Sequence, residues 1–388
     1  MEYIIILSYL LFCVYYFDIK RHKGTDFHYA LMLILFVLLS GLAYRVGTDA
    51  IRYEDKFYGD YKFSFDWDLF TNPSEIFTGQ PLWHFINWSF YHVFGEWIVF
   101  KLCLALFFNG TVFWYIKRHC SYSFTAVLFY FIFIYFEYNF ESLRETCAIC
   151  IMLIALDKFG GESGTEKNFA KYYSWVWPAL LFHYFGFITL LPPLLSYFKY
   201  DKWLVLLAIV AMLTVYFVPM NALFDIRLLS LLPEDSLDLM NYYIESDKYG
   251  TTTNNLNAYI ALFVRNIVAP LILFKNVKAD NNQSLAISYI LVTVLATFIL
   301  AFYRVGNYFI VPMAVVLSES WGNGFYNKHF NLLSCRLFSY RFVFVVCLGL
   351  MISIRFSALF GTDLWDHFYP YSAVYDKHQY LRREILLE

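Results

Sequence analysis

Long apolar stretches alternate with short polar connections along nearly the whole chain. Each stretch approaches the ~20 residues that a helix needs to cross a bilayer. We identify ten such stretches, at residues 3–18, 28–45, 97–116, 121–139, 142–158, 203–219, 258–276, 285–303, 305–321 and 341–357. The pattern predicts an all-α polytopic membrane protein with about ten transmembrane helices. We expect residues 1–388 to form a single transmembrane domain.

One further apolar stretch, residues 173–198, does not fit a simple span. It is long for one helix, and Pro178, Pro192 and Pro193 interrupt it. Backbone that leaves the helical conformation within a membrane is tolerated where protein or a wet cavity covers it. The stretch therefore predicts a re-entrant hairpin of two half-helices, with His183 near its tip.

The charges of the connections predict which side of the membrane each one faces. Lys and Arg are enriched in cytoplasmic loops, and the short connections contain Lys20, Arg21, Lys23, Lys117, Arg118, Lys158, Lys167, Lys171, Lys199, Lys202, Lys275, Lys278, Lys328 and Arg336. The two long connections, at about 47–81 and 221–257, carry seven acidic against three basic residues and six against two. We expect both to face outward, together with a C-terminal tail at about 358–388, and we expect both termini to lie outside.

Composition supports a membrane protein and argues against several other classes. The chain is 60% hydrophobic and only 15% charged, against roughly 25% charged in an average soluble domain. The net charge of −2 argues against a nucleic-acid partner, which would require a basic surface. The one close cysteine pair, Cys147 and Cys150, lies in an expected helix without a second pair, so we predict neither a metal site nor a cofactor.

Two polar motifs near the first long connection have ordinary interpretations. Asp66-Trp67-Asp68 has the spacing of the metal-binding pair of nucleotide-sugar transferases, but it lies in an expected outer loop, where nucleotide sugars are not expected. Residues 81–95 are too few to span comfortably and predict an interfacial helix on the outer face. We interpret His84 and His92 as residues of its polar face.

Six ionisable residues within or at the ends of the apolar stretches gather toward the expected outer face. They are Arg45, Arg144, Glu145, His183, Arg265 and Arg304. A single arginine at a helix end can place its charge among lipid headgroups. Several at one depth, with a histidine, favour a pocket for a lipid-linked diphosphate, because guanidinium groups bind phosphate oxygens in pairs.

A series of short motifs in a fixed order resembles the EpsG-like bacterial membrane proteins, a family similar to the Wzy polymerases of surface polysaccharides. The resemblance extends from about residue 3 to 376. It rests on Arg45, Gly47, Thr48, Asp49, Tyr53, Arg144, His183, Arg304, Tyr308 and Tyr369-Pro370-Tyr371-Ser372. The chain departs from the family pattern at Gln80, where the family usually has Glu, and at Glu145, where it usually has Gln. Glu145 is therefore a candidate partner of Arg144.

The resemblance implies a GT-C-like membrane glycosyltransferase of the bacterial cytoplasmic membrane, working without metal or cofactor. The implied donor is a polyprenyl-diphosphate-linked oligosaccharide, and a second lipid-linked unit is the acceptor. Arg144, Arg265 and Arg304 would neutralise the diphosphate, with Arg45 as a further contact or as a clamp on Asp49. His183 or Asp49 would accept the proton, and Tyr53, Glu145 and Tyr308 would complete the substrate contacts.

The product expected from this resemblance is a capsule, an exopolysaccharide or an O-antigen, and a flippase and a chain-length regulator are expected partners. Three alternatives stay open at this point. A glycan ligase would use the same donor, and an exporter or lipid flippase would also need arginines near a diphosphate. A membrane-bound acyltransferase would need a buried histidine, although its donor enters from the cytoplasm.

Overall fold

The computed structural model describes residues 2–72, 76, 79–160, 167–197, 210, 264, 268–274, 277, 280–296, 302–325, 340–360 and 364–377. The chain forms two compact units, residues 1–194 with 355–388, and residues 195–354. Throughout the described ranges the secondary structure is helical, and β pairing is limited to isolated bridges of Ala373 with Ala43 and Asp376. The all-α prediction is confirmed for this part of the chain.

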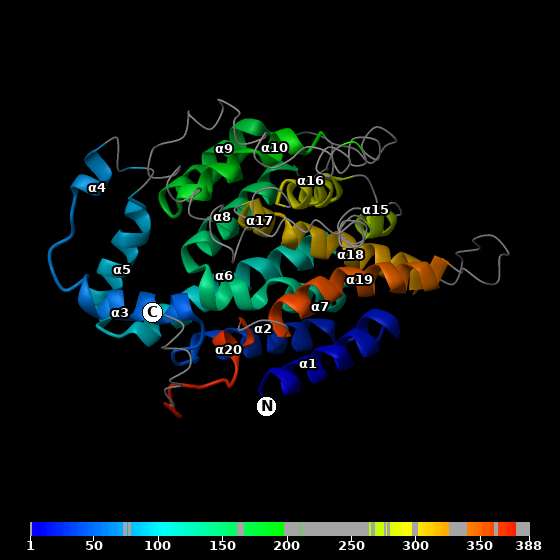
Figure 1. Cartoon of the computed structure of the whole chain (residues 1–388), viewed down its shortest axis with the longest axis horizontal. Helices are drawn as coiled ribbons and strands as arrows, with labels where there is room; N and C mark the ends of the chain where they lie inside the picture. Colours follow the sequence, from blue (N-terminus) through cyan, green and yellow to red (C-terminus); the bar gives the residue numbers. More distant parts are fainter. Residues whose placement is uncertain are drawn as a thin grey trace, which may run out of the picture. The chain divides into compact units, whose positions relative to one another are not determined.

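The helices follow one another in the order α1 (Glu2–Cys13), η1 (Val14–Ile19), α2 (Thr25–Gly41), α3 (Thr48–Gly59), α4 (Asp68–Thr71), α5 (Pro81–Phe94), α6 (Trp97–His119), α7 (Ser123–Phe133), η2 (Glu137–Glu141), α8 (Leu143–Phe159), α9 (Phe169–Val176), η3 (Trp177–Leu181), η4 (Tyr184–Leu190), α10 (Pro192–Leu195), α15 (Ala269–Phe274), α16 (Asn281–Ala296), α17 (Phe302–Asn307), α18 (Ile310–Phe325), α19 (Tyr340–Phe360) and α20 (Leu364–Phe368). Here η1 and η2 are π-helical, whereas η3 and η4 are 3-10 helices. Figure 1 shows their arrangement.

Two of the described helical segments are long and apolar enough to cross a membrane, Glu2–Ile19 and Trp97–His119. Shorter apolar helices occupy Thr25–Gly41, Ser123–Phe133 and Tyr184–Leu195. Except for residue 210, the expected span at 203–219 lies outside the described residues, as does most of the one at 258–276. The total of ten spans therefore stays a prediction.

The first unit is built around α2, α6 and α8. The helices α2 and α6 pack antiparallel: Tyr29 Oη donates to Phe113 O at 2.8 Å, and Lys117 Nζ pairs with Asp26 Oδ1 at 2.6 Å. The helix α8 packs beside α6 and runs parallel to it, because Arg118 at the end of α6 meets Asp157 at the end of α8. Basic residues in the last turn of α6 also complement its dipole.

This packing gives the first unit two chemically different ends. The basic end contains the start of α2 and the last turns of α6 and α8, with their Lys and Arg residues. The other end contains α3, α4 and α5, which lie together in Figure 1. The C-terminal segment joins this second end, since Tyr44 N donates to Ser372 O and Val374 N donates to Leu42 O. Connections that were predicted to lie on the same side of the membrane thus lie at the same end of the first unit. Which side of the membrane each end faces stays a prediction.

Residues 169–195 fold back on themselves, as the prolines predicted. Tyr172 Oη donates to Thr189 O at 2.6 Å, so α9 and η4 lie side by side. A Cβ atom at Gly186 would collide with the carbonyl of Ala179, so only glycine permits the close approach of η3 and η4. The reversal is confirmed, with 3-10 helices forming much of both arms, and His183 occupies the turn.

A ring of three buried polar side chains lies in the middle of the first unit. Asn109 Nδ2 donates to Asn139 Oδ1 at 2.8 Å, Asn139 Nδ2 donates to Tyr130 Oη at 3.1 Å, and Tyr130 Oη donates to Asn109 Oδ1 at 3.1 Å. Each of the three side chains hydrogen-bonds the next. Their burial among aromatic side chains therefore does not leave these polar groups without a partner, which would be unfavourable.

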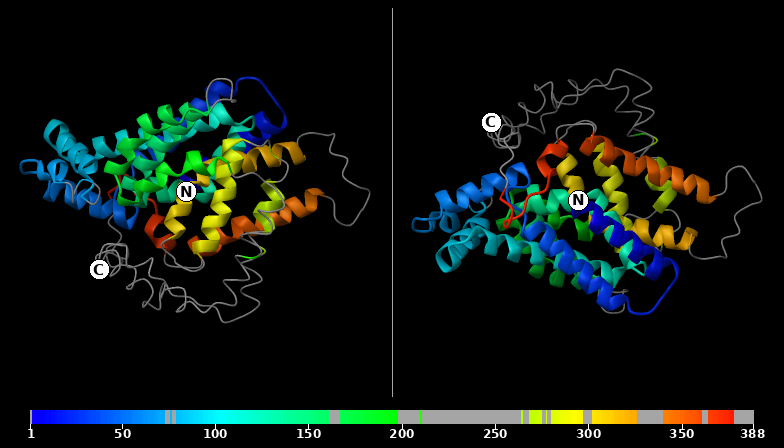
Figure 2. Two further views of the ribbon diagram at one scale, coloured as in Figure 1. Left: turned by 90° about the horizontal axis from the view of Figure 1, so that it is seen from above. Right: turned by 90° about the horizontal axis from the view of Figure 1, so that it is seen from below.

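The second unit contains a smaller helical cluster. The helix α16 packs against α15, α17 and α18, coloured yellow to orange in Figure 2. The hydroxyl of Ser320 in α18 hydrogen-bonds the carbonyl of Leu273 in α15. Gly306 in α17 lies against the ring of Tyr289 in α16.

Candidate functional site

Arg144 opens α8 and connects it to two elements that are distant in sequence. Its Nε donates to Tyr53 Oη of α3 at 3.1 Å, and its Nη1 donates to Gln80 Oε1 at 2.7 Å. The guanidinium also lies 5.4 Å from the centre of the Tyr53 ring, within cation–π range. Both hydrogen-bond acceptors are neutral, so these contacts position the guanidinium without neutralising its charge.

The partner Gln80 is itself fixed by the local backbone. It is buried and adopts a left-handed conformation with φ of 51° immediately before α5. Pro81 then begins that helix, where its missing N–H costs nothing. The departure from the family pattern at this position thus supplies a direct partner of Arg144. Glu145, the next residue of α8, is buried, and its pairing with Arg144 stays a prediction.

A small cavity of about 40 Å³ adjoins Arg144 and is lined by Tyr53, Lys56, Tyr61, Trp83, His84, Asn87 and Arg144. Within it, His84 Nδ1 and Tyr61 Oη are hydrogen-bonded at 2.9 Å. Burial lowers the pKa of His84, and the charges of Arg144 and Lys56 lower it further. Burial raises the pKa of Tyr53 to about 12. At neutral pH the cavity therefore presents a neutral imidazole and a phenol beside two cations.

His84 was not singled out by the sequence analysis, which assigned it to a polar helix face. The spacing of His84 and Asn87, three residues apart on α5, places them on one side of the helix. Both line the cavity. The same spacing would suit a solvated face, so the sequence alone did not distinguish the two cases.

The Gly47-Thr48-Asp49 motif forms the capped start of α3. Glu141 accepts from Thr48 N at 3.0 Å and from Asp49 N at 2.9 Å, one bond to each carboxylate oxygen. Its Oε1 also lies 3.2 Å from His367 Nδ1. Gly47 has φ of 89°, and a side chain there would strike the backbone of Phe140. Glu141 and His367 are thus supporting residues that the sequence analysis missed.

Arg45 and Arg144 contact different sides of α3. Arg45 Nη1 pairs with Asp55 Oδ1 at 3.1 Å, whereas Arg144 holds Tyr53. Residues two apart on a helix point in directions roughly 200° apart. Arg45 thus supports the loop before α3, and the side chain of Asp49 lies 3.7 Å from Arg52.

His183 is buried at the hairpin turn, toward the same end as Arg144. The chain enters the hairpin next to the last residue of α8, and α9 with η3 rises about 22 Å, close to the about 25 Å of α8. His183 Nδ1 accepts from Phe185 N at 3.3 Å and caps η4. A neutral imidazole with Nδ1 as an acceptor carries its proton on Nε2. In this state, His183 caps η4 through Nδ1 and can donate a hydrogen bond only through Nε2.

The structure does not determine where three of the other predicted residues lie relative to this site. Arg265 lies outside the described residues. Arg304 in α17 is exposed and Tyr308 is buried, and both belong to the second unit. Their participation beside Arg144 stays a prediction. In the first connection, Asp66 Oδ1 accepts a hydrogen bond from Asp68 N, at the start of α4.

Comparison with known proteins gives one result. The family model described as the EpsG family matches residues 26–373, most of the chain. No curated protein and no solved structure matches it. The apolar helices and the family match agree with a membrane protein of polysaccharide synthesis. With the motifs of α3 and α8 in their expected order, this match shows that the chain belongs to the EpsG family.

Proposed function

We propose that the protein is a membrane glycosyltransferase that polymerises lipid-linked oligosaccharide repeat units into a surface polysaccharide. The observation that carries the proposal is the Arg144 guanidinium, which is held by two neutral groups beside Lys56 and a neutral His84. Such a cation, fixed before the reaction begins, stabilises negative charge that develops on a leaving group.

The donor in this proposal is a polyprenyl-diphosphate-linked oligosaccharide. The acceptor hydroxyl of a second lipid-linked unit attacks the anomeric carbon of the donor and forms the new glycosidic bond. The bond from that carbon to the diphosphate breaks, and the electron pair leaves with the diphosphate. Arg144 and Lys56 offset its charge. Because the cavity is only about 40 Å³, the diphosphate binds at its mouth, where Lys56 is exposed.

We assign the acceptance of the acceptor proton to His84. A general base needs an unoccupied lone pair near neutral pH. When the Nδ1 proton of His84 is donated to Tyr61 Oη, the Nε2 lone pair is available. His183 instead uses Nδ1 for the Phe185 amide. Asp49 is the alternative base, while Arg265, Arg304 and Tyr308 are proposed contacts of the remainder of the donor.

The proposed location is the bacterial cytoplasmic membrane, with the Arg144 end and both termini facing outward. A flippase would deliver the donor to that face. A ligase would use the same bond changes but a different acceptor, so the product separates the two activities.

The test is chain extension by the purified protein given polyprenyl-diphosphate-linked repeat units. Arg144→Gln should lower the rate at least about a hundredfold, the loss of one charged transition-state contact. Arg144→Lys should recover only part of it, because lysine lacks the planar fork. Lys62→Gln, an exposed residue that does not line the cavity, is the matched control. Normal long polymer from Arg144→Gln would contradict the proposed role, and a single transfer to another acceptor would favour the ligase.

A further inference from the structure

A second and larger cavity lies at the basic end of the first unit. It has a volume of about 210 Å³, far above the space that one water molecule needs. The 17 residues of α2 separate this end from the start of α3, a distance of about 25 Å. The cavity is therefore separate from the Arg144 site. Its lining includes the cationic or titratable groups Arg21, His22 and Lys117 and the hydroxyls of Thr25, Ser121 and Ser123.

Arg21 contributes hydrogen-bond donors that are not used by the protein. Its backbone is left-handed with φ of 59°, and its guanidinium lies 4.4 Å from the centre of the Tyr122 ring. Among the side chains and carbonyls that the structure describes, none accepts a hydrogen bond from this guanidinium. The ring contact orients the group and leaves its N–H donors available to an anion.

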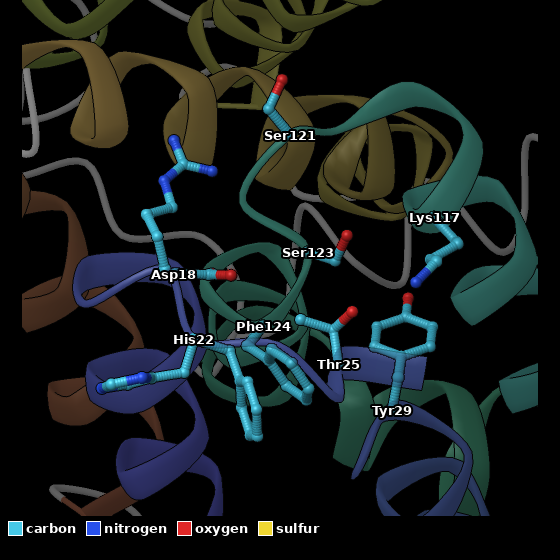
Figure 3. A pocket seen from close by; sticks show the side chains of 10 residues that line it. Asp18, His22, Thr25, Tyr29, Lys117, Ser121, Ser123 and Phe124 are labelled. Atoms are coloured by element: carbon cyan, nitrogen blue, oxygen red, sulfur yellow. The ribbon is translucent and has the colours of Figure 1, made fainter. Parts of the chain in front are cut away.

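Lys117 provides a second cation in the lining of the cavity. Figure 3 shows it turned toward Tyr29, with the hydroxyls of Thr25 and Ser123 between Lys117 and Asp18. Lys117 Nζ pairs with Asp26 Oδ1, but the Asp26 side chain is 89% exposed. Exposed ion pairs contribute little stability, so an incoming anion can compete for this lysine.

The carboxylate of Asp18, which also lines the cavity, is hydrogen-bonded to α7. Its Oδ2 accepts from both Thr125 N and Thr125 Oγ1 at 2.7 Å. These donors belong to the first turn of α7, whose dipole stabilises the carboxylate. Asp18 is buried, and the two Thr125 donors together with the nearby Arg21 offset its negative charge within the fold.

The wider surroundings are basic. The basic residues at this end are Lys20, Arg21, Lys23, Lys117, Arg118 and Lys158, and the acidic ones are Asp18, Asp26 and Asp157. Such an excess attracts anions over several ångströms before contact is made.

We propose that this cavity binds a phosphate group, carried either by the headgroup of an anionic phospholipid or by a soluble phosphate compound. Guanidinium, ammonium and hydroxyl groups arranged around one space are the donors that phosphate oxygens require. The lipid source is favoured by the neighbouring surface, because Tyr15, Tyr16 and Ile19 of η1 are exposed and apolar. Basic residues next to a span also attract the anionic lipids of a cytoplasmic leaflet.

The experiment uses the full-length protein in phosphatidylcholine nanodiscs, with phosphatidylglycerol as the lipid probe and inorganic phosphate as the soluble probe. Binding is measured by native mass spectrometry. Arg21→Gln should weaken phosphatidylglycerol binding about tenfold, the loss of one charged hydrogen-bonding group. Lys23→Gln removes the same charge two residues away, outside the lining, and should have a clearly smaller effect.

The two sources are separated by competition. Displacement of phosphatidylglycerol by inorganic phosphate supports a site for phosphate itself, whereas Arg21-dependent lipid binding without displacement supports a headgroup site. Equal losses in Arg21→Gln and Lys23→Gln would show diffuse attraction and overturn the proposal, as would the absence of binding of either probe. Thr25→Val, which retains every charge, should also weaken binding if the hydroxyl lining is used.

Discussion

Arg144 donates a 2.7 Å hydrogen bond to Gln80, a residue 64 positions earlier in the chain. This bond ties the start of α8 to the left-handed residue that precedes α5. The site thus depends on the backbone of a loop as well as on the arginine itself.

Substitution of Gln80 should separate positioning from charge. Gln80→Ala removes an acceptor from Arg144 and should lower the rate of chain extension about tenfold, since hydrogen bonds to charged groups contribute about 1.5–3 kcal/mol. Gln80→Glu keeps an acceptor in place but adds a charge that offsets Arg144, so its rate should lie between those of Gln80→Ala and the unaltered chain. If Gln80→Glu proves as inactive as Gln80→Ala, the unneutralised charge of Arg144 is the essential property.

The pH dependence of polymerisation should report the protonation of His84. Burial lowers its pKa below the ordinary value of 6.5, so the imidazole is neutral at pH 7 and becomes charged only in more acidic solution. The rate should fall below that lowered pKa and level off above it. His84→Gln should remove this acidic limb together with most of the activity.

His92→Gln is the control for this measurement, because His92 is exposed on the same helix. An unchanged acidic limb in His84→Gln would assign the titration to another group.

Glu141 should hold the start of α3 in place. Its carboxylate caps two amides of that helix, and loss of a cap costs about 1–2 kcal/mol. Glu141→Ala should therefore lower the thermal unfolding temperature and expose α3 to trypsin at Arg52 and Lys56, while Glu141→Gln should have a smaller effect. Equal protease resistance of Glu141→Ala and the unaltered chain would show that α3 is held by other contacts.

Membrane sidedness can be measured by cysteine labelling of intact cells. A membrane-impermeant maleimide should react with Lys62→Cys and not with Lys23→Cys, because the acidic loop is predicted outside and the basic connection inside. The unaltered chain, with its native free cysteines, provides the background. Reversed labelling would invert the proposed orientation, and labelling at neither position would require another pair of sites.

Local sequence properties predicted several parts of the fold. The apolar stretches correspond to α1, α2, α6, α7 and α8, since a continuous apolar run favours a buried helix. Of these, α6 and the segment formed by α1 with η1 are long and apolar enough to cross a membrane. The prolines of 173–198 predicted the reversal at His183, because they interrupt helical hydrogen bonding. The resemblance singled out Arg144 and Tyr53, which prove to be hydrogen-bonded partners.

The contacts between distant segments could not be predicted in the same way. Glu141 caps a helix about ninety residues earlier, and its sequence surroundings contain no sign of that role. His84 was assigned to a polar face because helical periodicity does not distinguish water from an internal polar cavity. The use of His183 Nδ1 by a backbone amide depends on the geometry of the turn, which local sequence does not specify.

The closed ring of Asn109, Asn139 and Tyr130 has a consequence for permeation. Each of these polar groups already uses its neighbour as a partner, and large aromatic side chains surround them. A solute or proton passing lengthwise between these three side chains would first have to break the hydrogen bonds that they make with one another. For the proposed function, this feature favours a lipid-linked substrate that approaches the Arg144 site laterally rather than along the axis of the first unit.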